Sequence, residues 1–128
     1  MTVNQRVAGS SPAAGADKVL NYQGLFVMYY IYIIYSETSD LYYVGYSDNP
    51  SRRLNEHNSI PFNTFTSKHR PWILKAVFEC GYKESDVMRL ERFIKKQKSR
   101  KLIEQLCDNS FIPVGFLAQL VRVPDVRD

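Results

Sequence analysis

The stretch YYIYIIYSETSDLYYVGYSDNPSRRLNEH, residues 29–57, decides the fold. Two runs within or beside it, 28–35 and 41–46, are rich in aromatic and β-branched side chains, which favour β-strands. The segment SETSD between them, residues 36–40, has the composition of a turn. The stretch therefore predicts a β-hairpin followed directly by a basic segment.

The basic segment and the remaining chain predict a small α+β domain. Asp48-Asn49-Pro50 indicates a helix start, because a side-chain cap precedes a proline at the first helical position. The elements expected after the hairpin are a helix at 50–58, a loop at 59–71, a strand at 72–80, a helix at 85–100 and a short helix to 107. The order is ββαβα with a second short helix, which predicts a small sheet with helices beside it.

The register of the hairpin determines which tyrosines meet. A tight loop at Glu37 and Thr38 predicts that Tyr32 lies directly opposite Tyr43. Directly opposed residues share a face of the sheet, with Cβ atoms about 4.5–5.5 Å apart, whereas a one-residue slip would separate the two rings. Gly45 lies on the same face as Tyr43, where a glycine inside a strand indicates either a close approach by another backbone or a ligand, or a bulge.

Length, charge and cysteine content restrict the class of protein. A chain of 128 residues with 45% hydrophobic residues can bury a core as one domain. Its net charge of +4 and pI of about 9.1 fit an anionic partner. Two cysteines favour free thiols in the cytoplasm over a disulfide framework or a metal site. The longest apolar run, residues 25–35, is shorter than the roughly 20 residues that span a membrane.

The two ends of the chain have an unusual composition. The residues GSSPA, 9–13, back-translate as GGT TCG AGT CCC GCC, which contains a pattern common to the T-arm of tRNA genes. Residues 117–122 back-translate to a sequence that resembles a tRNA D-arm. We therefore expect an open reading frame between two tRNA genes, with translation starting at Met28 and the natural protein ending before about Gly115. The expected segments are 1–27, a disordered or non-native extension; 28–107, the domain; and 108–128, a non-native tail.

Three polar side chains are candidates for a functional site. Arg53 and His57 lie four residues apart, so they share one face of the first helix, which is either a solvated face or part of a site. Glu91 interrupts an apolar stripe on the long helix, made by Val87, Leu90 and Ile94. A carboxylate at that position either pairs with Arg92 or Lys95 at the edge of the core or takes part in chemistry.

Many basic residues lie along the same long helix. They are Arg89, Arg92, Lys95, Lys96, Lys98, Arg100 and Lys101. Such a series either is a solvated helix face or tracks the phosphates of a nucleic acid, and Lys68 and Arg70 in the preceding loop favour the second reading. The candidate nucleic-acid-binding residues are Lys68, Arg70, Arg92, Lys95 and Lys96.

Together these motifs resemble the GIY-YIG nuclease superfamily, in particular its small stand-alone bacterial domains, over residues 28–106. Tyr30-Ile31-Tyr32 stands at the position of GIY, and Tyr43-Val44-Gly45 at that of YIG. The segments SDNPSRRLNEHN, FTSKHRPWILK and VMRLERFIKKQK follow in the order and spacing of the family. Two departures are Tyr30 in place of the motif glycine and the lack of an asparagine between residues 91 and 108.

The resemblance implies a three-stranded antiparallel sheet flanked by helices, and hydrolysis of DNA with one divalent ion, Mg²⁺ or Mn²⁺. Tyr32 and Tyr43 match the motif tyrosines, of which one would be the general base and the other would hold the water or the phosphate. Arg53 would bind the scissile phosphate, and His57 would orient the water or carry a proton. Glu91 would bind the metal. A free phenol has a pKa of about 10, which close cations would lower.

The expected partner is therefore DNA, in branched, flapped or single-stranded form, with no small-molecule cofactor and no membrane. Two alternatives remain. One is a catalytically inactive GIY-YIG-like module that binds nucleic acid without cutting it. The other is a structural domain whose tyrosines only pack.

Overall fold

A computed structural model describes residues 26–59 and 65–124. Its elements are β1 (Tyr30–Ser36), β2 (Leu41–Ser47), α1 (Pro50–Ser59), the 3-10 helix η2 (Thr66–His69), β3 (Trp72–Glu79), α2 (Glu84–Gln97), α3 (Arg100–Leu106), the 3-10 helix η3 (Gly115–Gln119) and β4 (Val121–Arg122). The predicted α+β class and the order ββαβαα of the main elements are confirmed. None of the helices in these two ranges is long and apolar enough to cross a membrane.

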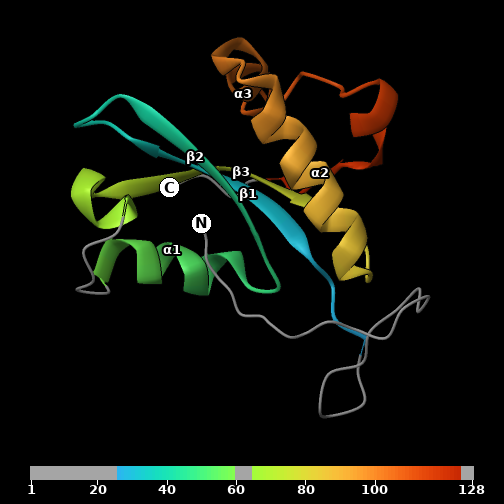
Figure 1. Ribbon diagram of the computed structural model, residues 1–128, viewed down its shortest axis with the longest axis horizontal. Helices are drawn as coiled ribbons and strands as arrows, with labels where there is room; N and C mark the ends of the chain where they lie inside the picture. Colours follow the sequence, from blue (N-terminus) through green and yellow to red (C-terminus); the bar gives the residue numbers. More distant parts are fainter. Residues whose placement is uncertain (1–25, 60–64, 125–128) are drawn as a thin grey trace.

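The strands form one antiparallel sheet in the order β2-β1-β3-β4. The described sheet has four strands where three were expected, because Val121 and Arg122 pair with the end of β3. Helix α1 lies on one side of the strands, and α2 and α3 lie on the other (Figure 1). Each face of the sheet therefore has its own set of side chains and its own helices.

Capping residues set the ends of the helices. Asn49 caps α1 as predicted, with its Oδ1 accepting a hydrogen bond from the Arg52 backbone N–H at 3.0 Å. The long helix ends at Gln97, before the predicted residue 100, because Lys98 adopts a left-handed conformation with a φ of 48°. Ser99 then caps α3, with its Oγ accepting from the Leu102 N–H at 3.1 Å.

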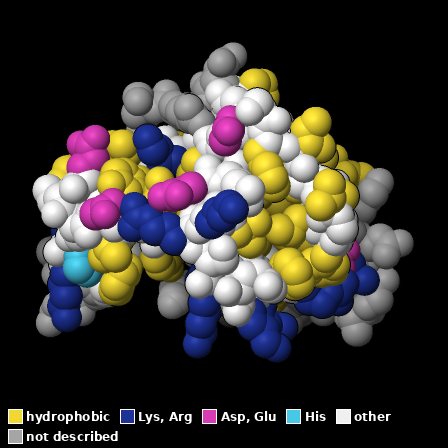
Figure 2. Space-filling view, turned by 90° about the horizontal axis from the view of Figure 1, so that it is seen from above, with side chains coloured by type: hydrophobic (Ala, Val, Ile, Leu, Met, Phe, Trp, Pro, Cys, Tyr) yellow, Lys and Arg dark blue, Asp and Glu magenta, His cyan; other side chains and the backbone are white. Residues whose placement is uncertain are grey.

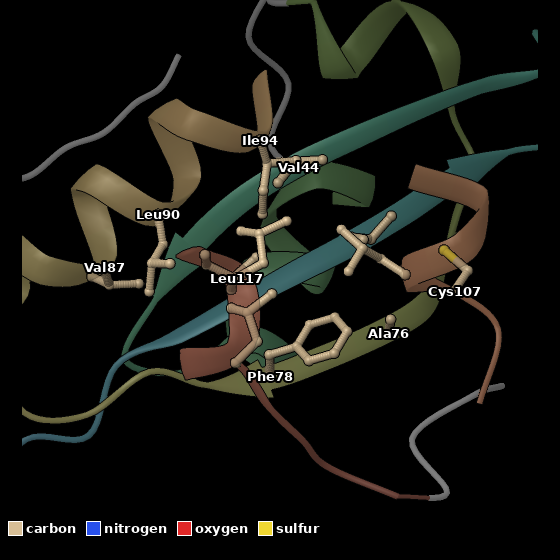
Figure 3. Close-up of a cluster of buried hydrophobic side chains, with 12 residues drawn as sticks. Val44, Ala76, Phe78, Val87, Leu90, Ile94, Cys107 and Leu117 are labelled. Atoms are coloured by element: carbon tan, nitrogen blue, oxygen red, sulfur yellow. The ribbon is translucent and has the colours of Figure 1, made fainter. Parts of the chain in front are cut away.

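The main core lies between the sheet and α2. The predicted apolar stripe of Val87, Leu90 and Ile94 is at most 1% exposed and packs against strand residues that include Val44 and Phe78 (Figure 3). Full burial of an aliphatic or aromatic side chain contributes about 1.5–3 kcal/mol. The larger of the two buried clusters thus lies on the α2 face, and the opposite face carries most of the candidate site residues.

The predicted hairpin register is wrong by two residues. The loop between β1 and β2 has four residues, 37–40, so Ser36 pairs with Leu41 and Tyr32 pairs with Gly45. The loop is held from outside the hairpin, because the Arg100 guanidinium donates hydrogen bonds to the carboxylate and the carbonyl of Asp40. A shift of two residues preserves the face, so Tyr32 still shares its face with Tyr43.

Gly45 accommodates the ring of Tyr32. A Cβ atom at this position would lie 2.5 Å from Tyr32 Oη and 2.6 Å from its Cζ. The sequence left open a bulge or a close approach by another backbone or a ligand, whereas the group that approaches Gly45 is a side chain of the neighbouring strand.

Residues 115–122 pack onto the domain. Leu117 and Leu120 are each 6% exposed and belong to the main core. Arg122 donates a hydrogen bond from Nη1 to the Leu106 carbonyl at 2.8 Å, and its guanidinium lies 4.8 Å from the centre of the Phe78 ring. The expected domain bounds stay a prediction, and residues 1–25 of the expected N-terminal extension lie outside the described residues.

We expect Gly45→Ala to lower the free energy of unfolding by about 1–3 kcal/mol, because the new methyl group overlaps the Tyr32 ring. Urea denaturation of Gly45→Ala, Tyr32→Leu and the double variant measures this overlap as a coupling energy. Since leucine removes the overlapping atoms, the alanine should cost much less in the Tyr32→Leu background. Strictly additive costs would contradict the close packing of the two residues.

Leu117→Ala should lower the free energy of unfolding by about 2–5 kcal/mol, because it removes buried methyl groups from the core. Ile112→Ala is the matched control, since Ile112 is 79% exposed and its truncation should change stability by less than about 0.5 kcal/mol. Urea denaturation of both variants provides the measurement. Equal stability of Leu117→Ala and the wild type would show that this segment does not pack on the core.

Candidate active site

A buried hydrogen bond between β1 and α1 is at the centre of the candidate site. The Tyr32 Oη and His57 Nε2 atoms lie 2.8 Å apart, and the two residues are 1% and 4% exposed. Tyr32 comes from the centre of the sheet, and His57 from the buried side of α1. The helix therefore places an imidazole directly against the first motif tyrosine.

His57 is neutral in the folded protein. Burial, and after it the positive charges of Arg53 and Arg70, lower the pKa of its imidazole to about 3. Arg70 also donates a hydrogen bond from Nε to the His57 backbone carbonyl at 2.5 Å. A neutral imidazole has one nitrogen that can accept a proton.

Burial also keeps Tyr32 protonated. Desolvation raises the pKa of its phenol well above the ordinary value, and the nearby Tyr43 acts in the same direction. Arg53 lowers this pKa through its charge and a hydrogen bond, but its effect is smaller than that of burial. Arg53 therefore lowers the phenol pKa as expected, but desolvation outweighs it, so the net shift of the Tyr32 pKa is upward.

Tyr43 lies beside His57 on the same face of the sheet. The two ring centroids are 5.1 Å apart, against 5.8 Å between Tyr32 and His57. Tyr43 is half-buried and also contacts the edge of Trp72, with ring centroids 6.1 Å apart. The two motif tyrosines therefore meet around one histidine, although they are not directly opposed in the sheet.

Arg53 lies one helical turn before His57 on α1. Its side chain is 25% exposed and makes an ion pair with Glu56, and its charge acts on both Tyr32 and His57. Four of the five candidate catalytic residues thus lie together on the α1 side of the sheet.

Glu91 reaches the edge of this group from α2. Its side chain is 18% exposed, and Lys95 Nζ lies 3.4 Å from its Oε2, which is one of the two pairings expected. Burial raises the pKa of the Glu91 carboxyl, and Lys95 lowers it. The Lys95 ammonium lies 5.3 Å from the centre of the Tyr43 ring, so it bridges the carboxylate and the second motif tyrosine.

The donor set around Glu91 fits a hard cation with few protein ligands. No group of three or more His, Cys, Asp and Glu side chains that could hold a metal occurs within residues 26–59 and 65–124. Mg²⁺ is usually bound by one or two carboxylates, several waters and the substrate phosphates. Glu91 could hold such an ion once Lys95 releases its carboxylate.

The candidate nucleic-acid-binding residues differ in exposure. Lys68, Arg92, Lys95 and Lys96 are exposed, whereas Arg70 is half-buried against α1. Figure 2 shows Lys and Arg side chains in separate groups between hydrophobic patches over the face that it presents. The Lys and Arg side chains therefore do not form one continuous stripe on that face.

Two residues at the site were not singled out from the sequence. Asn58 Oδ1 accepts a hydrogen bond from the Trp72 N–H at 2.7 Å, and Asn58 Nδ2 donates to the Trp72 carbonyl at 3.0 Å, which joins α1 to the start of β3. Phe65 is 52% exposed and stacks on Tyr43. Both lie within the quoted family-like segments, but their partners are distant in the sequence, so no local pattern predicts these contacts.

A comparison with protein families supports the assignment suggested by these residues. The family described as the GIY-YIG catalytic domain matches residues 28–104. A comparison with curated proteins gave no match. The matched segment makes up more than half of the 128-residue chain, and the protein therefore belongs to the GIY-YIG family of nucleases.

Proposed function

We propose that the protein is a metal-dependent endonuclease that hydrolyses phosphodiester bonds of DNA in the cytoplasm. The observation that carries the proposal is the 2.8 Å hydrogen bond between the Tyr32 phenol and a neutral His57, with Arg53 beside both. A packing tyrosine alone would explain the burial of Tyr32 and a hydrogen-bond partner for its hydroxyl, but not the Arg53 charge fixed beside it.

Tyr32 and His57 act as one proton-accepting pair. The attacking water gives a proton to Tyr32 Oη, while the phenol gives its own proton to His57 Nε2. This relay does not need a free phenolate, which the raised pKa of Tyr32 disfavours; the imidazolium that it forms is disfavoured by burial in the free protein, so the relay requires the negative charge of the bound phosphate beside His57. Because Tyr32 is 1% exposed in the free protein, the water enters its position together with the substrate.

Arg53 and Tyr43 hold the reacting groups. The Arg53 guanidinium binds the scissile phosphate and stabilises the charge that develops on it in the transition state. Tyr43 is more exposed than Tyr32 and lies beside the same histidine, so its hydroxyl positions the attacking water.

Glu91 is the proposed ligand of one Mg²⁺ or Mn²⁺ ion. When bound, this ion supplies positive charge for the leaving oxygen. Lys95 holds the Glu91 carboxylate in the free protein, and its ammonium moves to a substrate phosphate when the carboxylate is released.

A second candidate function is nucleic-acid binding without hydrolysis. It is favoured by the ion pairs that occupy both key charged groups, between Arg53 and Glu56 and between Glu91 and Lys95. If these pairs persist in the complex, the exposed Lys and Arg side chains could still bind phosphates. The Arg53 guanidinium and the Glu91 carboxylate would then not contact the reacting groups.

Glu91→Gln should reduce cutting about a hundredfold or more, because it removes the charge that holds the metal. The assay incubates supercoiled plasmid, single-stranded DNA and branched DNA with Mg²⁺ or Mn²⁺, and chelation of the metal should stop cutting by the wild type. Glu104→Gln is the matched control, since this exposed carboxylate on α3 pairs only with Arg100 among its described ion pairs. DNA binding with no cutting under either metal would favour the second candidate function.

Tyr32→Phe should lower the cutting rate about 10²- to 10⁴-fold and change DNA affinity little, because the ring over Gly45 is kept. Tyr35→Phe, which removes from the same strand a hydroxyl that is bonded to Asp40, should leave the rate unchanged.

Since His57 has a pKa of about 3, it stays neutral between pH 5 and 8, and the cutting rate should show no inflection near pH 6.5. Such an inflection, if lost in His57→Gln, would contradict a buried neutral histidine.

A further inference from the structure

We propose that Phe65 is a stacking site for an unpaired nucleobase, and that the substrate is accordingly a DNA with a single-stranded segment at the point of cutting. The inference rests on the proposed function for the identity of the ligand, and it adds a binding residue and a substrate form.

Phe65 presents an aromatic ring to solvent next to the candidate site. It is 52% exposed, whereas the neighbouring Trp72 is 2% exposed. Its ring lies 6.3 Å from that of Tyr43 at an interplanar angle of 27°, and Tyr43 in turn contacts His57. A base that stacks on the exposed side of Phe65 would therefore lie one ring away from a proposed catalytic tyrosine.

The ring is held by a rigid set of neighbours. The Phe65 ring also contacts His69 and Trp72, with ring centroids 4.7 Å and 6.4 Å away. The Trp72 indole N–H donates to the Thr66 carbonyl at 2.8 Å, and a 2.8 Å hydrogen bond joins His69 Nδ1 to Ser39 Oγ in the hairpin loop. The segment that carries Phe65 is thus tied to β3 and to the hairpin, so the ring is oriented before a ligand arrives.

Two lysines lie near this aromatic surface. Lys68 is exposed in the same 3-10 turn, and the Lys95 ammonium lies over the Tyr43 ring. Aromatic rings beside positively charged side chains are the combination that binds single strands, because the nucleobases stack on the rings while the cations contact phosphates. In a duplex each base is already stacked and paired, so it cannot present a free face to Phe65.

The single tryptophan of the chain provides a reporter. Full-length protein in EDTA is titrated with a fluorescein-labelled oligothymidylate of about 12 nucleotides and with a duplex of equal length, and affinity is followed by anisotropy. With unlabelled oligothymidylate, the Trp72 emission should change on binding. Phe65→Ala should weaken single-strand binding about 5- to 150-fold and duplex binding less than twofold.

Matched variants separate stacking from packing. Phe65→Tyr should keep the single-strand affinity, and Phe65→Leu should lose it although leucine keeps most of the apolar packing. Phe116→Ala should have no effect, since Phe116 is 43% exposed and its ring contacts that of Phe93 at the α2 side. Unchanged single-strand affinity in Phe65→Ala and Phe65→Leu, or equal losses for single strand and duplex, would overturn the proposal, and tighter binding of oligouridylate than of oligothymidylate would overturn the assignment to DNA.

The outcome is independent of hydrolysis, because binding is measured without a divalent ion. If no DNA is cut under any metal but Phe65→Ala loses single-strand affinity, the proposed hydrolysis fails and the stacking site stands. If DNA is cut and the Phe65 variants bind single strands like the wild type, the stacking site alone fails.

Discussion

The packing of the Tyr32 ring against Gly45 is the constraint on which the candidate site depends. The neighbouring strand has no side chain at this position, so the phenol can lie close to its backbone. From there its hydroxyl meets His57, and α1 must lie where the imidazole can reach it. The position of α1 then places Arg53, and Asn58 joins the helix to the start of β3. One close contact within the sheet thus orients the whole α1 side of the site.

Local chemistry predicted the elements and the set of candidate residues. The Asn49-Pro50 cap and the apolar stripe of Val87, Leu90 and Ile94 depend on neighbours within one or two helical turns, and both were predicted correctly. The hairpin loop has four residues rather than two, and its residue Asp40 is bound by Arg100, 60 residues further along the chain, so the turn composition alone led to a two-residue error. The residues still shared a face because an even shift preserves the alternation of side chains.

The electrostatic balance could not be predicted from the residue types. Nearby cations were expected to lower the phenol pKa, but the sequence does not show how deeply Tyr32 is buried, and desolvation proved the larger effect. The same burial gives His57 its low pKa. A protonated phenol against a neutral imidazole suits transfer of a proton through the pair rather than proton abstraction by a preformed phenolate. Burial therefore determines which kind of general base the pair can form.

The internal ion pairs are too weak to decide against catalysis. The side chains of Arg53 and Glu56 are 25% and 31% exposed, and those of Lys95 and Glu91 are 41% and 18% exposed. Partly exposed pairs within one helix contribute about 0–1 kcal/mol each, whereas a hydrogen bond that involves a charged group contributes about 1.5–3 kcal/mol. A phosphate that meets Arg53, or a cation that meets Glu91, can therefore displace the internal partner. In the free protein the two pairs balance charges that would otherwise be partly buried and unpaired, and they hold both side chains at the positions where a substrate would meet them.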